Sequence, residues 1–121
     1  MYTYPFEKLE VWKLSKSLVV SIYKTTEKFP AEERFGLVNQ MRRAAVSISS
    51  NLAEGSGRNT AKDQAYFYNM AYSSLMELLN QLLIAFDLKW IAEEEVNRLR
   101  EDMEVISLKI NALRKSILKD G

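Results

Sequence analysis

Hydrophobic side chains recur at alternating spacings of three and four residues along most of this chain. That repeat is typical of an amphipathic α-helix, because side chains three and four apart lie on one face. The longest series is Val96, Leu99, Met103, Ile106, Ile110, Leu113 and Ile117. Similar series begin at Val11, Val38 and Phe67. The pattern therefore predicts four helices, at about residues 9–28, 34–55, 60–87 and 92–118.

The residues between these series predict where the helices begin and end. Pro30 disfavours a helical residue before it and suits the first turn after it, so the first helix ends there and a new turn opens. Gly36 weakens that turn, and we expect the second helix to become regular only after it. Gly55 is expected to stop the second helix in a left-handed conformation. Thr60, with Asp63 three residues later, is expected to cap the third helix.

Short connections join the four predicted helices, and this decides their arrangement. A helix that follows another after only a few residues runs antiparallel to it. We therefore expect an all-α fold, an antiparallel up-down-up-down four-helix bundle. The chain has 121 residues, which is enough for one hydrophobic core, so we expect a single domain.

The third helix has more hydrophobic surface than one bundle needs. A second apolar stripe, about 100° round from the first, consists of Tyr72, Met76, Leu79 and Leu83. A helix in a four-helix bundle needs only the first stripe to pack against its neighbours. The second stripe predicts an apolar interface between copies of the chain in a homo-oligomer.

The second helix has an unusual polar face. Its members are Gln40, Arg43, Ser47, Asn51 and Glu54, and Glu77 on the third helix is a further candidate partner. Serine and asparagine are weak helix formers, and the four that crowd this stretch cost the helix about 2 kcal/mol: Ser47, Ser49, Ser50 and Asn51. Two interpretations stay open: a solvated surface, or a face that contacts another helix, a subunit or a ligand. In the second, we expect Arg43 to pair with Glu54 or Glu77 within a hydrogen-bonded network.

Composition excludes several kinds of chemistry. The chain has no cysteine and no histidine, which removes disulfides, thiol nucleophiles, histidine catalysis and nearly all zinc sites. A hydrolytic or two-metal site built from carboxylates is the remaining enzymatic alternative, but metal sites in helix bundles usually need histidine. We therefore expect no enzymatic activity, no cofactor, no metal site and no small-molecule substrate. We also expect a cytoplasmic protein, because the sequence shows neither a secretory leader nor a long apolar stretch that could enter a membrane.

Positive charge is concentrated in one segment of a nearly neutral chain. The net charge is +1, yet Glu54 is the only acidic residue in the stretch 34–62. The candidate phosphate contacts in this basic segment are Arg34, Arg42, Arg58 and Lys62. Three tyrosines that could stack on bases follow: Tyr66, Tyr68 and Tyr72. Aromatic residues at helical spacing are more often buried in a core or an interface, so both interpretations stay open.

Several runs of residues resemble one known family. They are Phe29-Pro30, Glu33 to Leu37, Gln40 to Ile48 and Asn51 to Arg58, with Glu77 on the third helix. From Leu9 to about Leu118 the chain is similar to the four-helix bundle proteins named after the intervening sequences of 23S ribosomal RNA. Relatives of that family accompany reverse transcriptases in diversity-generating retroelements. The chain departs from the family at Tyr72-Ser73-Ser74, where members often have Arg-Gly-Ser.

The resemblance implies a bacterial cytoplasmic bundle that assembles as a ring, expected to be a pentamer, and that binds RNA or an RNA-handling protein. Two functional hypotheses follow. The first is a non-enzymatic homo-oligomer that binds RNA or other nucleic acid through the basic segment from Arg34 to Lys62. The second is a protein-interaction or structural module, for example an accessory to an RNA-handling enzyme, without affinity of its own for nucleic acid. The positions of Arg42, Arg58 and Lys62 in space distinguish them.

Overall fold

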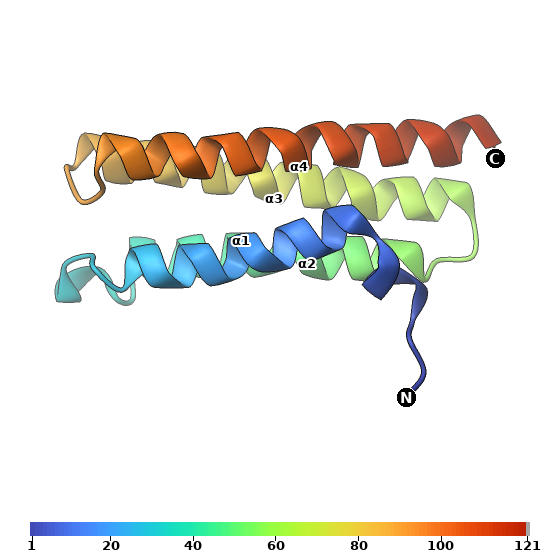
Figure 1. Cartoon of the computed structure of the whole chain (residues 1–121), viewed down its shortest axis with the longest axis horizontal. Helices are drawn as coiled ribbons and strands as arrows, with labels where there is room; N and C mark the ends of the chain where they lie inside the picture. The colour runs from blue at the N-terminus through green and yellow to red at the C-terminus, as the bar shows by residue number, and fades with distance from the viewer. Residues whose placement is uncertain (121) are drawn as a thin grey trace.

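Four long helices lie side by side along one axis (Figure 1). The computed structural model describes the backbone of residues 1–120 and the side chains of residues 1–119. The helices are α1 (Glu10–Thr26), α2 (Leu37–Ser56), α3 (Ala61–Asp87) and α4 (Glu93–Asp120). Two short 3-10 helices, η1 (Pro5–Lys8) and η2 (Ala31–Glu33), precede α1 and α2. The largest difference from a predicted bound is three residues, at the start of α2, which begins at residue 37 rather than 34.

Successive helices run in opposite directions, as the short connections predict (Figure 1). The α1–α2 and α3–α4 connections therefore meet at one end of the bundle, which we call the α3–α4 end. The α2–α3 connection and both ends of the chain lie at the other, which we call the α2–α3 end. This placement decides which charged residues gather together, because residues far apart in sequence share an end.

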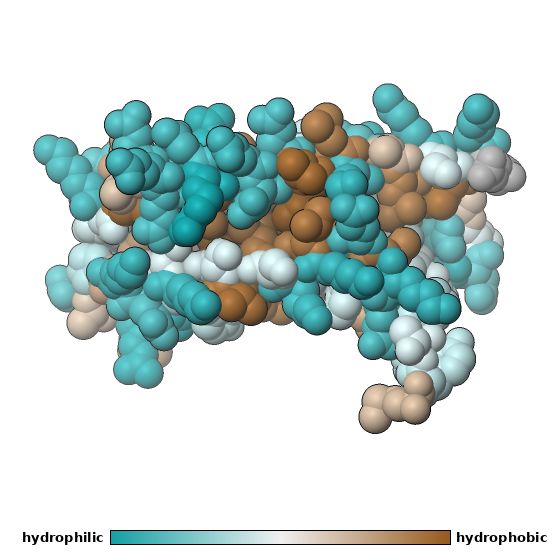
Figure 2. Space-filling model, viewed as in Figure 1, coloured by the Kyte–Doolittle hydropathy of each residue, from teal (hydrophilic) through white to brown (hydrophobic). Residues whose placement is uncertain are grey.

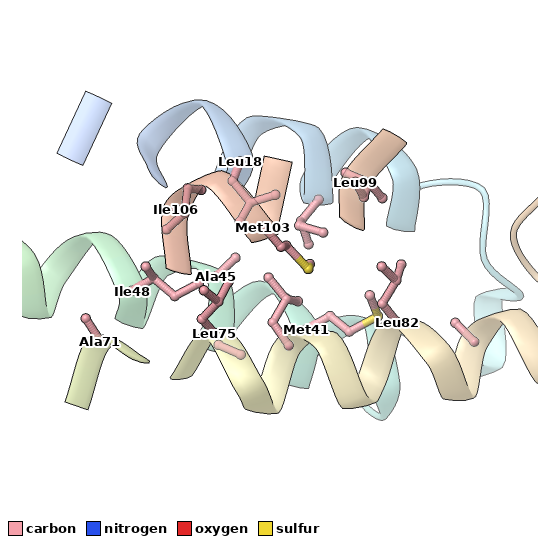
Figure 3. Packing of buried hydrophobic residues seen from close by; sticks show 14 of the residues in the cluster. Leu18, Met41, Ala45, Ile48, Ala71, Leu75, Leu82, Leu99, Met103 and Ile106 are labelled. Carbon is pink, nitrogen blue, oxygen red and sulfur yellow. The ribbon is translucent and has the colours of Figure 1, made fainter. Parts of the chain in front are cut away.

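Most of the side chains predicted for the core form it, but Phe67, which begins the predicted series of α3, is only partly buried. Figure 3 shows Leu18 of α1, Met41 of α2, Leu75 of α3 and Ile106 of α4 turned toward the same interior, and all four are almost fully buried. The last two members of the α4 series, Leu113 and Ile117, are only partly buried. The physical reason is the length of α1. Lys109 Nζ lies 3.4 Å from Glu10 Oε1, at the first residue of α1, so the end of α4 extends past that helix.

Gly55 is where α2 and α3 come too close for a side chain. A Cβ at this position would lie 2.7 Å from the ring of Tyr68 and 3.0 Å from Cβ of Phe67. Gly55 lies inside α2, which ends at Ser56, and its φ is not positive. The predicted left-handed stop at Gly55 is therefore wrong. Burial raises the pKa of the Tyr68 hydroxyl, so this ring stays neutral at physiological pH as it packs on Gly55.

The helix caps follow local chemistry. Thr60 Oγ1 accepts a hydrogen bond from the backbone N–H of Asp63 at 3.1 Å, which confirms the predicted cap of α3. At the other end of α3, Lys89 adopts a left-handed backbone with φ of 64°. The N–H of Trp90 donates to the carbonyl of Ala85 at 3.0 Å and that of Lys89 to Phe86 at 2.9 Å, which is the Schellman pattern. The chain thus reverses tightly there without a glycine.

Replacing Gly55 with alanine tests the close approach of α2 and α3. The added methyl group overlaps the buried Tyr68 ring, so Gly55→Ala should lower the free energy of unfolding by about 1–2 kcal/mol, after allowing for the better helix propensity of alanine. Gly57→Ala is the matched control, because a Cβ there meets only the Glu54 carbonyl oxygen at 3.6 Å. We expect that variant to be unchanged or slightly more stable in urea unfolding. Equal midpoints for the two variants would contradict the close approach.

Candidate nucleic-acid interface

The predicted basic segment does not form one surface. Arg34 lies in the α1–α2 connection at the α3–α4 end, whereas Arg58 and Lys62 lie at the α2–α3 end (Figure 1). The 20 residues of α2 separate them, a length of about 30 Å at about 1.5 Å per residue. A single nucleic-acid strand therefore cannot contact all of these side chains as neighbours on one subunit.

Arg42 is occupied within its own chain. Its Nε donates to Thr26 Oγ1 at 2.9 Å, and its Nη2 donates to the carbonyl oxygen of Tyr23 at 3.2 Å. The guanidinium also lies 4.4 Å from the centre of the Tyr23 ring. These groups belong to the last turn of α1, where a positive charge complements the helix dipole. Arg42 thus joins α2 to the end of α1, with two of its guanidinium nitrogens engaged within the chain, and its predicted phosphate contact stays a prediction.

Arg34 lies among carboxylates. It is exposed, and its guanidinium is 5.8 Å from the centre of the exposed Phe35 ring. Seven acidic residues lie in or beside the turns of the α3–α4 end: Glu27, Glu32, Glu33, Asp87, Glu93, Glu94 and Glu95. The basic residues at this end are Lys24, Lys28, Arg34, Arg42, Lys89 and Arg98. An excess of carboxylates repels phosphate, so this end is the poorer candidate for binding nucleic acid.

The α2–α3 end gathers cations from two parts of the sequence. They are Arg58 and Lys62 from the start of α3 and its connection, and Arg114, Lys115 and Lys119 from the end of α4. Arg114 hydrogen-bonds Asn69 of α3, and it also donates to Asn111 Oδ1 at 3.1 Å, which fixes the end of α4 beside the start of α3. Among the described side chains of these segments, the carboxylates are Glu54 and Asp63. The start of the chain lies at the same end and adds Glu7 and Glu10 against Lys8 and Lys13. The described side chains of this end therefore keep an excess of positive charge.

Lys115 and Lys119 of α4 lie far along the sequence from the basic segment 34–62. Their gathering with Arg58 and Lys62 follows from the antiparallel arrangement, which brings residue 119 next to the first turn of α3 (Figure 1). Counting charge along the sequence could not reveal this, because the two groups are more than fifty residues apart. The predicted topology could have indicated it.

The three candidate tyrosines have different exposures. Tyr66 is 59% exposed, Tyr68 is 2% exposed and Tyr72 is partly buried against the core. Tyr66 meets Phe67 edge to face, with ring centres 5.4 Å apart and planes at 90°. The guanidinium of Arg58 lies 4.3 Å from the centre of the Phe67 ring. Of the three, Tyr66 has the most ring surface open to solvent.

A hydrogen-bonded bridge crosses from α2 to α3 at the polar face. Ser47 Oγ and Ser74 Oγ are 2.8 Å apart. Asn51, which is 9% exposed, donates from Nδ2 to the backbone oxygen of Ser47 at 2.8 Å and to its Oγ at 3.0 Å. The polar face therefore does contact another helix. Ser74, which was not among the residues predicted for this network, is the partner.

Arg43 does not take part in that bridge. Among side chains 1–119, the ion pairs are Lys28 with Glu95, Arg98 with Glu95, and Lys109 with Glu10. Arg43, Gln40 and Glu77 instead line a surface hollow of about 380 Å³ between α2 and α3. Glu54 is exposed near the end of α2. The predicted pairing of Arg43 with Glu54 or Glu77 is therefore wrong within the single chain.

The second apolar stripe of α3 is used mainly by its own bundle. Tyr72, Leu79 and Leu83 are partly buried and pack on the core, and Met76 is 36% exposed. Met76 and Leu79 line a hollow of about 500 Å³ between α3 and α4. Hydrophobic side chains are also exposed on α4, where Val105 and Leu108 are 44% and 62% open to solvent. Figure 2 shows a hydrophobic band in the middle of the face formed by α1 and α4.

Within residues 1–119, no three side chains of histidine, cysteine, aspartate or glutamate come together in a group that could hold a metal ion. None of the helices described, up to residue 120, combines the length and the apolar character that a membrane crossing needs.

Comparison with known proteins supports the resemblance found in the sequence. Residues 7–112 match the family described as 23S rRNA-intervening sequence protein. A solved structure of a protein with unknown function from the S23 ribosomal protein family of Bacteroides thetaiotaomicron is similar, with a TM-score of 0.78. The two are 21% identical, and the similarity covers 87% of this chain and 98% of that one. At this identity the likeness shows the four-helix fold alone. No curated protein matches the chain.

Substituting the neighbouring residues Arg42 and Arg43 separates their roles. Arg42→Met removes the hydrogen bonds to the end of α1, so it should lower the free energy of unfolding by about 1–2 kcal/mol. Arg43→Met removes an exposed side chain without an intrachain ion pair, and we expect a change below about 0.5 kcal/mol. Urea unfolding of the two variants is the measurement. A larger loss for Arg43→Met would restore the ion-pair hypothesis and contradict the role assigned to Arg42.

Proposed function

The chain belongs to the 23S rRNA-intervening sequence protein family, and we propose that it is a non-enzymatic, homo-oligomeric bundle that binds RNA through its α2–α3 end. The proposed RNA-binding surface is made from two segments of the chain, in place of the continuous basic segment predicted from the sequence. It keeps Arg58 and Lys62 from that segment and adds Lys115 and Lys119 from α4. It leaves out Arg34 and Arg42. The protein would act in the bacterial cytoplasm, where its RNA would be found.

The observation that supports this proposal most directly is the gathering of cations at one end of a nearly neutral protein. Arg58, Lys62, Lys115 and Lys119 are all exposed. None of the four takes part in an ion pair among side chains 1–119, so each can approach a phosphate without breaking one. Binding of this kind gains its free energy by releasing counterions from the nucleic acid. It is therefore strongly salt-dependent and nearly independent of base sequence.

A single subunit offers only a few such contacts, so its affinity would be weak. In a ring, the same end of each subunit would be displayed several times around one axis. Once one subunit holds the RNA, the others meet it at a high effective concentration, and weak contacts add up. Family resemblance suggests a pentamer. The hydrophobic side chains left open on α4, Val105 and Leu108, together with Met76 of α3, are the surface we propose for contacts between subunits.

A second function is favoured by the same hydrophobic surface. If the exposed residues of α4 contact another protein rather than a copy of the chain, the bundle would be an accessory to an RNA-handling enzyme without affinity of its own for RNA. The two functions predict different results for the purified protein, because only the first gives direct binding.

Removing charge from the α2–α3 end tests RNA binding. We expect the double variant Arg58→Ser, Lys62→Ser to bind a structured RNA more weakly at about 50 mM salt, and to reduce the slope of log affinity against log salt by about 1 for each residue removed. Fluorescence polarisation is the measurement. The variant's oligomeric state should be the same as that of the unmodified protein.

The matched control removes two positive charges from the opposite end. Lys24→Ser, Arg34→Ser changes the net charge by the same amount, but we expect little change in affinity because these residues lie at the α3–α4 end. If both double variants weaken RNA binding equally, the affinity depends on the total charge of the protein and not on the α2–α3 end. No binding by the unmodified oligomer at low salt would favour the accessory function.

Light scattering tests the oligomer. The chain has a mass of 14.0 kDa, and we expect a particle several times heavier, with five copies as the number implied by the family. Leu108→Glu places a charge on the exposed surface of α4 and should shift the mass toward that of one chain. Val46→Glu is the control, since Val46 is 39% exposed on α2, outside the face formed by α1 and α4. A single-chain mass at micromolar concentration for the unmodified protein would contradict the proposal.

A further inference from the structure

We propose that Tyr66 is a stacking platform for one unpaired base of a single-stranded RNA, with Arg58 and Lys62 on the phosphates beside it. This inference rests on the proposed function and deepens it, because it names the kind of RNA that the α2–α3 end recognises. Phosphate contacts alone would not distinguish single strands from duplexes or from any other polyanion.

The ring of Tyr66 is exposed to solvent, and its neighbour Phe67 limits its motion. It is 59% exposed, so a planar ligand can reach it. Its neighbour Phe67 contacts it edge to face at 5.4 Å, an arrangement that steadies the Tyr66 ring without lying parallel over it. Phe67 is itself partly buried and has the guanidinium of Arg58 at 4.3 Å from its ring centre. Phe67 thus contacts both the Arg58 guanidinium and the exposed Tyr66 ring.

Charges flank the platform at a distance that suits a nucleotide. Lys62 lies four residues before Tyr66 on α3, so the two side chains share one face and their Cβ atoms are about 6 Å apart. Asp63 lies three residues before Tyr66 and four before Phe67, the ring that Arg58 covers. Its carboxylate repels phosphate, so the strand is expected to follow the side of Lys62. Met70, one turn after Tyr66, is 40% exposed and extends the apolar surface under a base.

Single-stranded RNA fits this site better than duplex RNA. In a duplex each base face is covered by its neighbours, and the protein meets the phosphates and sugars instead. A base that has left the stack can lie on an exposed aromatic ring, whatever its identity. Tyr68 and Tyr72 are too buried to offer the same surface. The site therefore accepts about one base on each subunit, and an oligomer would hold a strand at several points.

The test compares two strands that differ only in having bases. The probes are a fluorescently labelled oligouridine of about 20 nucleotides and an abasic ribose-phosphate strand of the same length and charge, measured by polarisation at about 50 mM salt. We expect the unmodified protein to bind oligouridine at least about tenfold more tightly than the abasic strand. Tyr66→Leu should abolish this preference while leaving abasic binding unchanged. Tyr66→Trp should keep it.

Phe35→Leu is the matched control, because Phe35 is 86% exposed beside Arg34 at the opposite end. That variant should retain the full preference for oligouridine. Circular dichroism and light scattering establish that the Tyr66 variants keep the fold and the assembly, as expected for an exposed side chain.

The outcomes separate this inference from the proposed function. Equal binding of the two strands by the unmodified protein overturns base stacking and leaves phosphate binding intact. A preference for oligouridine that survives in Tyr66→Leu places the base elsewhere and also overturns the inference. Failure of both strands to bind overturns the proposed function together with the platform.

Discussion

The close contact between α2 and α3 is the constraint on which the rest of the structure depends. Gly55 leaves room for the Tyr68 ring, and further along the two helices Ser47 and Ser74 meet at hydrogen-bonding distance. Two helices held this close can be joined by the few residues between Ser56 and Ala61. The short connection makes α3 antiparallel to α2, and the later turn returns the end of α4 to the same end of the bundle. The gathering of positive charge is thus a consequence of backbone packing.

Most of the fold could be predicted because it follows from local chemistry and periodicity. The spacing of buried residues determined the four helices, and Thr60 identified the start of α3. The errors arose where a residue's role depends on a distant neighbour. Gly55 is compatible with either a turn or a close contact, and only the position of the Tyr68 ring decides between them. The second stripe of α3 suggested a surface to be covered, but the bundle itself partly buries Tyr72 and Leu83.

The candidate site was less predictable for the same reason. Adjacent arginines, Arg42 and Arg43, point in directions about 100° apart on a helix, and the sequence does not show which of them meets the end of α1. Arg42 hydrogen-bonds the end of α1, although it was expected to contact phosphate. Arg43 is exposed, although it was expected to pair with a carboxylate. Net charge was also uninformative. The value of +1 conceals an acidic α3–α4 end and a basic α2–α3 end, which appear only when the helices are folded together.

The central claim is that RNA meets the α2–α3 end of each subunit, and amide hydrogen exchange measured with and without single-stranded RNA at low salt tests it most directly. Helix ends exchange fast enough to report a bound ligand. The account predicts slower exchange in residues 57–66 and 114–119 when RNA is added, and no change in residues 27–36 and 87–95 at the other end. Slower exchange confined to the α3–α4 end, or an unchanged pattern at saturating RNA, would contradict it.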